Sequence, residues 1–160
     1  MTRIASLVRP VIAALEALPY AVLALLARFS IAAVFWKSGQ TKIEGLAIDL
    51  IQGKVELGLP RVTASAIDLF REEYKLPLLP PELAAYLAAA AEHVFPVLIL
   101  IGLATRLSAL ALAIMTLVIQ IFVYPDAYAL HGTWLAVLLM LAKFGPGSLS
   151  VDAAIANRST

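Results

Sequence analysis

The chain contains no cysteine, which excludes disulfide bonds, thiol redox chemistry and thiolate metal sites. It has only two histidines, and without cysteine these do not make a conventional metal site. Charge is also scarce: Asp, Glu, Lys and Arg make up 14% of the 160 residues, against about 25% in an average soluble domain. With a net charge of +1, there is no electrostatic basis for binding nucleic acid.

Apolar residues, by contrast, are abundant. They make up 62% of the chain, and the mean hydropathy is +0.92. A soluble protein of this size would expose a large apolar surface and aggregate. Four runs approach the roughly 20 apolar residues that cross a bilayer as a helix, at about 18–38, 83–103, 107–124 and 130–144. We therefore predict an all-α, integral membrane four-helix bundle forming one domain over residues 1–160.

The segment from Lys37 to Glu82 is polar by comparison, with six Lys or Arg and seven Asp or Glu. Ile67, Phe70 and Tyr74 recur within it at helical spacing, which predicts an amphipathic helix at about 66–75. This helix would lie on the membrane surface or over the bundle. A second amphipathic helix, at the interface, is predicted before the first span from the spacing of Ile4, Leu7, Val8, Val11, Ile12 and Leu15.

The distribution of Lys and Arg favours cytoplasmic termini. Arg3 and Arg9 precede the first span, Arg106 lies in the turn between the second and third spans, and Lys143 and Arg158 flank the end of the last span. The turn at 125–130 has no Lys or Arg. The long polar segment would then be extracytoplasmic. Its six basic residues argue for the opposite orientation.

Three ionisable residues lie inside the apolar runs, where charge is expensive and indicates a functional site. These are Arg28, Glu92 and His93. Measured from the ends of their runs, Arg28 and Glu92 come out at the same depth, and small residues flank both at helical spacing. We therefore predict a buried Arg28–Glu92 ion pair. It would either lock two helices together or form the floor of a ligand or proton-handling site, whereas His93 alone is more typical of helix packing.

A second polar group lies towards the outer surface and consists of Gln120, Tyr124, His131 and Trp134, with Lys42 beyond the first run. An aromatic belt with snorkelling lysines would explain much of this group. The alternative is a ligand pocket in the outer half of the bundle, formed by these residues with His93, reached by Glu92 and His131, and covered by the 66–75 helix. A third possibility is that these side chains satisfy one another and leave no cavity.

Several segments together resemble the DoxX family of small bacterial membrane proteins. They are RFSIAAVFWKSGQTK at 28–42, IDLFREEYKLPLLPP at 67–81, EHVFPVLILIGLATR at 92–106, VIQIFVYP at 118–125 and GPGSLSVD at 145–152. The resemblance implies a four-helix bundle in the bacterial inner (plasma) membrane, with family positions at Arg28, Gly39, Lys42 and Glu92. Some relatives, of the DoxD type, are subunits of thiosulfate:quinone oxidoreductase, but cysteine chemistry does not carry over to this chain.

Three functions follow as hypotheses. The first is a membrane subunit of a redox system that binds a quinone between its helices, with electrons supplied by a partner. The second is a non-catalytic anchor or assembly factor for another protein, or a homo-oligomer, with the long polar segment as its docking surface. The third and weakest is a small permease with Arg28 binding an anion. Under all three hypotheses, the spans are in contact with the lipid bilayer.

Overall fold

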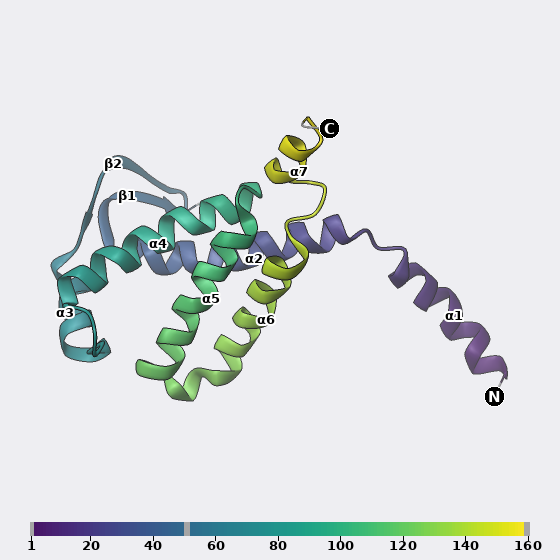
Figure 1. The fold of residues 1–160 in the computed structure, drawn as a ribbon, viewed down its shortest axis with the longest axis horizontal. Coiled ribbons are helices and arrows are strands. Elements are labelled where there is room, and N and C mark those ends of the chain that lie inside the picture. The colour runs from purple at the N-terminus through teal and green to yellow at the C-terminus, as the bar shows by residue number, and fades with distance from the viewer. Residues whose placement is uncertain (1, 50–51, 159–160) are drawn as a thin grey trace.

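The computed structural model describes residues 2–49 and 52–158 (Figure 1). Within this part of the chain, four segments are long and apolar enough to cross a membrane. They are α2 (Tyr20–Gln40), α4 (Pro81–Ile101), α5 (Thr105–Phe122), and α6 (Tyr128–Phe144) with the short 3-10 helix η2 (Pro125–Ala127) before it. The first three differ from the predicted runs by two residues at each end, whereas the fourth span begins earlier, at Pro125.

The four helices are arranged as two pairs, α2 with α4 and α5 with α6. In Figure 1 the two pairs diverge from the end of the molecule where α4 turns into α5. Near that end, large apolar side chains from all four helices pack into one buried cluster, which includes Ile31, Phe35, Ile99, Leu112, Leu138 and Leu141. The divergence leaves space between the pairs at the opposite end.

Small residues allow α2 and α4 to approach closely, as is typical of membrane helices. A Cβ atom added to Gly39 would lie 2.7 Å from His93 Cε1 and 3.0 Å from Glu92 Cβ. The end of α2 is therefore level with the middle of α4. The first half of α4 extends beyond α2, and its buried residues Ala84, Ala85 and Ala88 pack against Phe70.

The segment between α2 and α4 begins with a β-hairpin, formed by β1 (Ile43–Asp49) and β2 (Lys54–Val62). The predicted all-α fold, with a long loop in this segment, did not include these two strands. Val55, Leu57 and Leu59 alternate with other residues in the two-residue period of a strand, and Gly53 has the positive φ of 66° that a tight turn favours. This signal was present in the sequence but lay outside the apolar runs.

After the hairpin, the chain forms α3 (Ala64–Leu69) and a five-residue π-helix, η1 (Phe70–Tyr74). The Thr63 side chain caps α3 by accepting a hydrogen bond from the Ala66 amide at 3.1 Å. These helices occupy nearly the same residues as the helix predicted at about 66–75. They turn Ala66 and Phe70 towards the first half of α4 and leave Asp68 and Arg71 exposed.

Two further helices lie outside the four spans. α1 (Thr2–Glu16) projects away from the bundle in Figure 1, and its side chains from Leu7 to Glu16 are exposed. Ile4, part of the predicted apolar stripe, lies outside the residues whose side chains are described. At the other end, Ser150 caps α7 (Val151–Ala156) by accepting a hydrogen bond from the Ala153 amide at 3.2 Å.

Candidate functional site

Arg28 lies at the end of the bundle where the two helix pairs meet, and its guanidinium binds backbone carbonyls. It donates hydrogen bonds to Leu100 O at 3.3 Å and to Leu149 O at 2.5 Å. Only 1% of Arg28 is exposed. The side chain therefore ties α2 to the last turn of α4 and to the loop that follows α6.

The predicted Arg28–Glu92 ion pair is wrong. Leu100, the partner of Arg28 on α4, lies eight residues beyond Glu92, which is roughly 12 Å along a helix. The prediction assumed that the two helices end level with each other, but α4 continues past the end of α2 and packs against α3 and η1. Equal distances from the helix ends therefore did not mean equal depth.

Glu92 pairs instead with Lys42, at 2.7 Å between Oε2 and Nζ. Ser38 completes this cluster: its hydroxyl donates to Glu92 Oε1 at 3.1 Å, and Lys42 Nζ donates to Ser38 O at 3.2 Å and to Ser38 Oγ at 3.1 Å. Both charged residues are almost completely buried, with Lys42 4% and Glu92 2% exposed. A charged pair this deep needs such hydrogen bonds to offset the loss of water.

The backbone around Lys42 explains why this lysine does not reach out to solvent. The Lys42 amide donates to Gly39 O at 2.9 Å, and the Thr63 amide donates to Lys42 O at 3.0 Å. These bonds hold the residue between the end of α2 and the end of β2. The hairpin thus turns what the sequence presents as a snorkelling lysine back towards α4.

His93 lies on the other side of Gly39 and contacts a different set of groups. Its Nε2 is 2.9 Å from Gln40 Nε2, its Nδ1 is 2.7 Å from Ala89 O, and its ring lies 5.0 Å from that of Trp36. The structure therefore places His93 in helix packing against α2 rather than among the residues that line the cavity described next.

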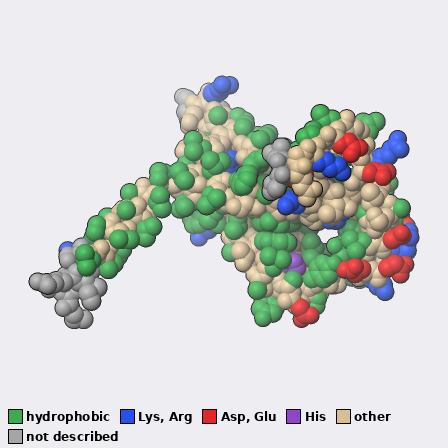
Figure 2. Space-filling view, turned by 180° about the vertical axis from the view of Figure 1, so that it is seen from behind, with side chains coloured by type: hydrophobic (Ala, Val, Ile, Leu, Met, Phe, Trp, Pro, Cys, Tyr) green, Lys and Arg blue, Asp and Glu red, His purple; other side chains and the backbone are tan. Residues whose placement is uncertain are grey.

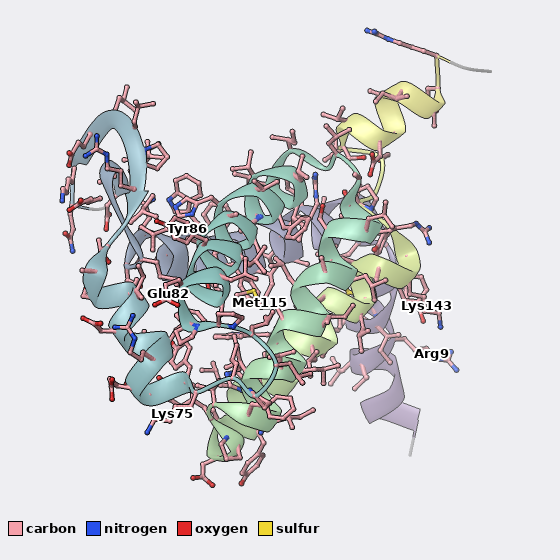
Figure 3. The ribbon with its side chains drawn as sticks, turned by 60° about the vertical axis from the view of Figure 1, so that its left-hand side comes forward. Arg9, Lys75, Glu82, Tyr86, Met115 and Lys143 are labelled. Carbon is pink, nitrogen blue, oxygen red and sulfur yellow. The ribbon has the colours of Figure 1, made fainter. Side chains whose placement is uncertain are left out.

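A cavity of about 640 Å³ lies between the diverging helix pairs. Glu92, Lys42 and Ser38 line it on the α2–α4 side, His131 and Trp134 on the α6 side, and Phe70 and Tyr74 from η1. Figure 2 shows a hollow on one face of the molecule, with hydrophobic side chains around it and a histidine at its edge. Met115, labelled in Figure 3, reaches from α5 into the space next to α4.

The α6 side of the cavity contains an oriented histidine. His131 Nδ1 lies 2.7 Å from Gln120 Oε1, and Gln120 Nε2 donates to Pro125 O at 2.6 Å. Gln120 uses its amide oxygen as an acceptor, so Nδ1 carries the proton and Nε2 is the atom that His131 can offer to a ligand. Gln120 itself does not line the cavity. Its role in this geometry is to fix the His131 ring, which lies 5.1 Å from the Trp134 ring.

The π-helix η1 is attached to the α5–α6 side by Tyr124. The Tyr124 hydroxyl donates to Glu73 Oε1 at 2.5 Å, and its ring meets that of Tyr74 edge to face at 5.7 Å. The hydrogen bond to Glu73, followed by burial, raises the pKa of the Tyr124 hydroxyl above its ordinary value. Arg71, also on η1, forms an ion pair with Glu82 at the start of α4, with 2.5 Å between Nη2 and Oε1 (Figure 3). The π-helix is therefore tied to both helix pairs.

The cavity combines an apolar slot with polar groups on two opposite sides. Lys42, His131 and Trp134 are the nitrogen-bearing side chains that line it, and Ser38, Tyr74 and Tyr124 add hydroxyls. Of the residues predicted for a ligand pocket, Lys42, Tyr124, His131 and Trp134 line this cavity, whereas His93 and Gln120 do not. Among the described residues, no three His, Asp or Glu side chains lie together in a way that could hold a metal ion.

Comparison with known proteins supports the family resemblance. The DoxX family model matches residues 23–125, which include most of α2, the hairpin, α4 and α5. No curated protein and no solved structure matches the chain. With four helices able to cross a membrane and this match, the protein is a multi-pass membrane protein. The chain belongs to the DoxX family.

Proposed function

We propose that the protein binds a lipid-soluble quinone in the cavity between its helix pairs, as a membrane subunit of a redox system. The observation that carries this proposal is the pairing of an apolar slot with polar side chains on two facing sides. Binding sites for small molecules usually have this composition, with a few polar groups that set orientation. A quinone ring presents two carbonyl oxygens at opposite ends and needs an apolar surface on each face.

Some of the residues that line the cavity can bind the carbonyl oxygens of a quinone, and others can cover the faces of its ring. The positive charge of Lys42 can face one carbonyl from the α2–α4 side, and the Tyr74 hydroxyl can donate to the other from η1. From the α6 side, the unprotonated Nε2 of His131 can accept a hydrogen bond from a hydroxyl of the reduced quinol. Trp134 and Met115 provide apolar surface for the ring. Glu92 holds Lys42 in place at 2.7 Å. Since the chain has no cysteine, thiol chemistry in such a system belongs to a partner protein.

We also propose where the protein is located and how it is oriented in the membrane. We place the protein in the bacterial inner membrane with cytoplasmic termini, in line with the Arg and Lys residues near the ends of the chain. The hairpin, α3 and η1 then lie on the outer side. The cavity between the helix pairs is on that side of the molecule, close to η1.

An anchor or assembly function is the second candidate, and one surface favours it. Val55, Leu57 and Leu59, at every second position along β2, are 61%, 79% and 82% exposed. Apolar side chains in such a row are typical of a surface that binds another protein. A stable partner that leaves this site when Leu57 and Leu59 are changed to Ser would support the anchor function.

Tryptophan fluorescence tests the quinone proposal, because the chain has only two tryptophans. Trp134 lines the cavity and Trp36 does not. In detergent, a short-chain quinone should quench the fluorescence of Trp36→Phe, in which Trp134 remains, and the quenching should saturate. The Trp134→Phe variant should show only weak, non-saturating quenching.

Two neighbouring residues on α6 supply a matched comparison. Changing His131 to Ala should weaken saturable quenching in the Trp36→Phe background by roughly tenfold, which corresponds to about 1.4 kcal/mol. Thr133→Ala should leave it unchanged, because Thr133 is exposed and does not line the cavity, and its hydroxyl donates to Ala129 O at 2.9 Å. Equal, non-saturating quenching of both tryptophans would indicate partitioning of quinone into the micelle and would remove the proposal.

A further inference from the structure

A second hollow lies on the opposite side of α2, between that helix, α4 and the β-hairpin. Its volume is about 700 Å³. The hollow, which we call the hairpin groove, has an apolar part lined by Phe29, Ala32, Ala33, Pro96, Val97 and Leu100. Its polar part is lined by Lys37, Gln40, Thr41, Asp49, Gln52 and Lys54. It shares no lining residue with the cavity between the helix pairs.

Two hydrogen bonds hold the hairpin over this groove. Trp36 Nε1 donates to Ile48 O at 3.2 Å, and Gln40 Oε1 accepts from the Ile48 amide at 2.8 Å. The outer edge of β1 is thereby satisfied by side chains of α2 at Ile48. His93 holds Gln40 in turn, through the contact of 2.9 Å between their Nε2 atoms. The roof of the groove is therefore fixed to the two helices that form its floor.

The floor of the groove belongs to helices that cross the membrane. Phe29, Val97 and Leu100 are 61%, 43% and 43% exposed, so apolar side chains face the groove without being covered by protein. The small side chains of Ala32 and Ala33 let a ligand approach the backbone of α2. From Phe29 to Gln40 the groove extends along α2 for roughly 16 Å at 1.5 Å per residue. This shape suits an extended acyl chain.

The charged residues of the polar part favour an anionic head group. Lys37 and Lys54 both line the groove, and within the described residues neither ammonium has a carboxylate within ion-pair distance. Asp49 is the one acidic residue among the lining residues, and its Oδ1 accepts the Gln52 amide at 3.0 Å within the hairpin turn. The groove therefore offers two cations next to an apolar channel.

We propose that the hairpin groove binds an anionic phospholipid, with its phosphate between Lys37 and Lys54 and one acyl chain along Ala33, Val97 and Leu100. Lysines next to an apolar surface attract anionic lipid head groups in this way. The hairpin belongs at head-group level, since the open edges of a two-stranded sheet need water and are not tolerated in the hydrocarbon layer. The bound lipid fills the space beneath it and holds the hairpin against α2.

Native mass spectrometry of the delipidated full-length protein tests this site. The probes are phosphatidylglycerol and phosphatidylcholine with identical acyl chains. We expect one phosphatidylglycerol to bind at least tenfold more tightly than phosphatidylcholine. The Lys37→Gln/Lys54→Gln double variant should lose this preference. The control Lys75→Gln/Lys143→Gln removes the same charge from residues outside the groove and should keep the preference.

A second variant tests the acyl channel independently of charge. Ala33→Trp should fill the groove and lower the affinity for both lipids, while circular dichroism shows unchanged helix content. The proposal is overturned if the two lipids bind equally to the unmodified protein, or if both lysine double variants lose the preference alike. It is also overturned if a second copy of the chain, detected as a dimer, displaces the lipid.

Discussion

At the residue scale, the burial of Lys42 determines the chemistry of the cavity. This lysine follows the last residue of α2 by two positions, yet it is 4% exposed and lies 2.7 Å from Glu92. Two charges of opposite sign without bulk water are stable only together, because either one alone keeps the full cost of desolvation. The pair thus gives an apolar cavity a polar wall without leaving a net charge there.

This dependence predicts a specific pattern in a double-mutant cycle. Glu92→Gln or Lys42→Met alone should lower the free energy of unfolding by about 3–5 kcal/mol, because each leaves one buried charge without its partner. The double variant should recover part of that loss. Unfolding in mixed detergent micelles measures each value. As a control, the exposed pair Arg71–Glu82 should show much weaker coupling.

If the loss of unfolding free energy in the double variant equals the sum of the losses in the two single variants, Lys42 and Glu92 do not interact in the membrane.

At the scale of elements, the contact of α2 with α4 at Gly39 aligns the two helices. A side chain at this position would meet His93 and Glu92 at once, at 2.7 and 3.0 Å. Gly39→Ala should therefore push the helices apart and lower stability by about 1–3 kcal/mol. Gly132→Ala on α6 is the matched control, because nothing lies within 4 Å of the added Cβ atom. Thermal unfolding of both variants measures the difference, and equal stability would contradict this packing.

The attachment of η1 predicts an unusual tyrosine titration. The hydrogen bond to Glu73 raises the pKa of Tyr124, so the stabilisation is complete below the ordinary tyrosine pKa of about 10. It is lost as the pH rises through the higher pKa of the folded state. In a titration followed by tyrosinate absorbance, Tyr124 should remain protonated at pH 10. The late part of the curve should be missing in Tyr124→Phe and should move to lower pH in Glu73→Gln.

An unchanged late phase in Tyr124→Phe would assign that titration to another tyrosine and contradict the attachment of η1.

The helices could be predicted from the sequence, because their signal is local. Runs of apolar residues gave α2, α4 and α5 to within two residues. The pairing of Lys42 with Glu92 could not be predicted, since it depends on how far α4 slides past α2, and on a hairpin that turns the chain back after Lys42. The hairpin itself left a trace in the alternation of Val55, Leu57 and Leu59. The extension of α4 beyond the end of α2 left no such signal in the sequence.

At the scale of the whole molecule, the two helix pairs are joined tightly at one end and separated at the other. Arg28 holds the closed end through Leu100 O and Leu149 O. Asp152 adds to it by accepting the Ala104 amide at 2.8 Å and the Thr105 amide at 3.1 Å. At the open end, η1 and Tyr124 cross the gap. The cavity therefore results from the way the pairs are joined.

Four spans require both termini on one side and the η1 region on the other. Because the chain has no cysteine, single cysteines can report sidedness without background. Leu78→Cys lies in an exposed loop after η1, and Glu16→Cys lies at the end of α1. In intact spheroplasts, a membrane-impermeant maleimide should label Leu78→Cys but should label Glu16→Cys only after lysis. Labelling of both positions before lysis would contradict the four-span arrangement.

The most direct test of the central claim is to identify where a quinone touches the protein. A photoreactive quinone analogue should label the cavity segments of α4 (84–92), α5 (111–119) and α6 (130–134), as mapped by peptide mass spectrometry. Excess unlabelled quinone should abolish this labelling, and Glu92→Gln should reduce it. Labelling that resists competition, or that falls on α1 and the outer faces of the spans, would show that the cavity does not bind a quinone.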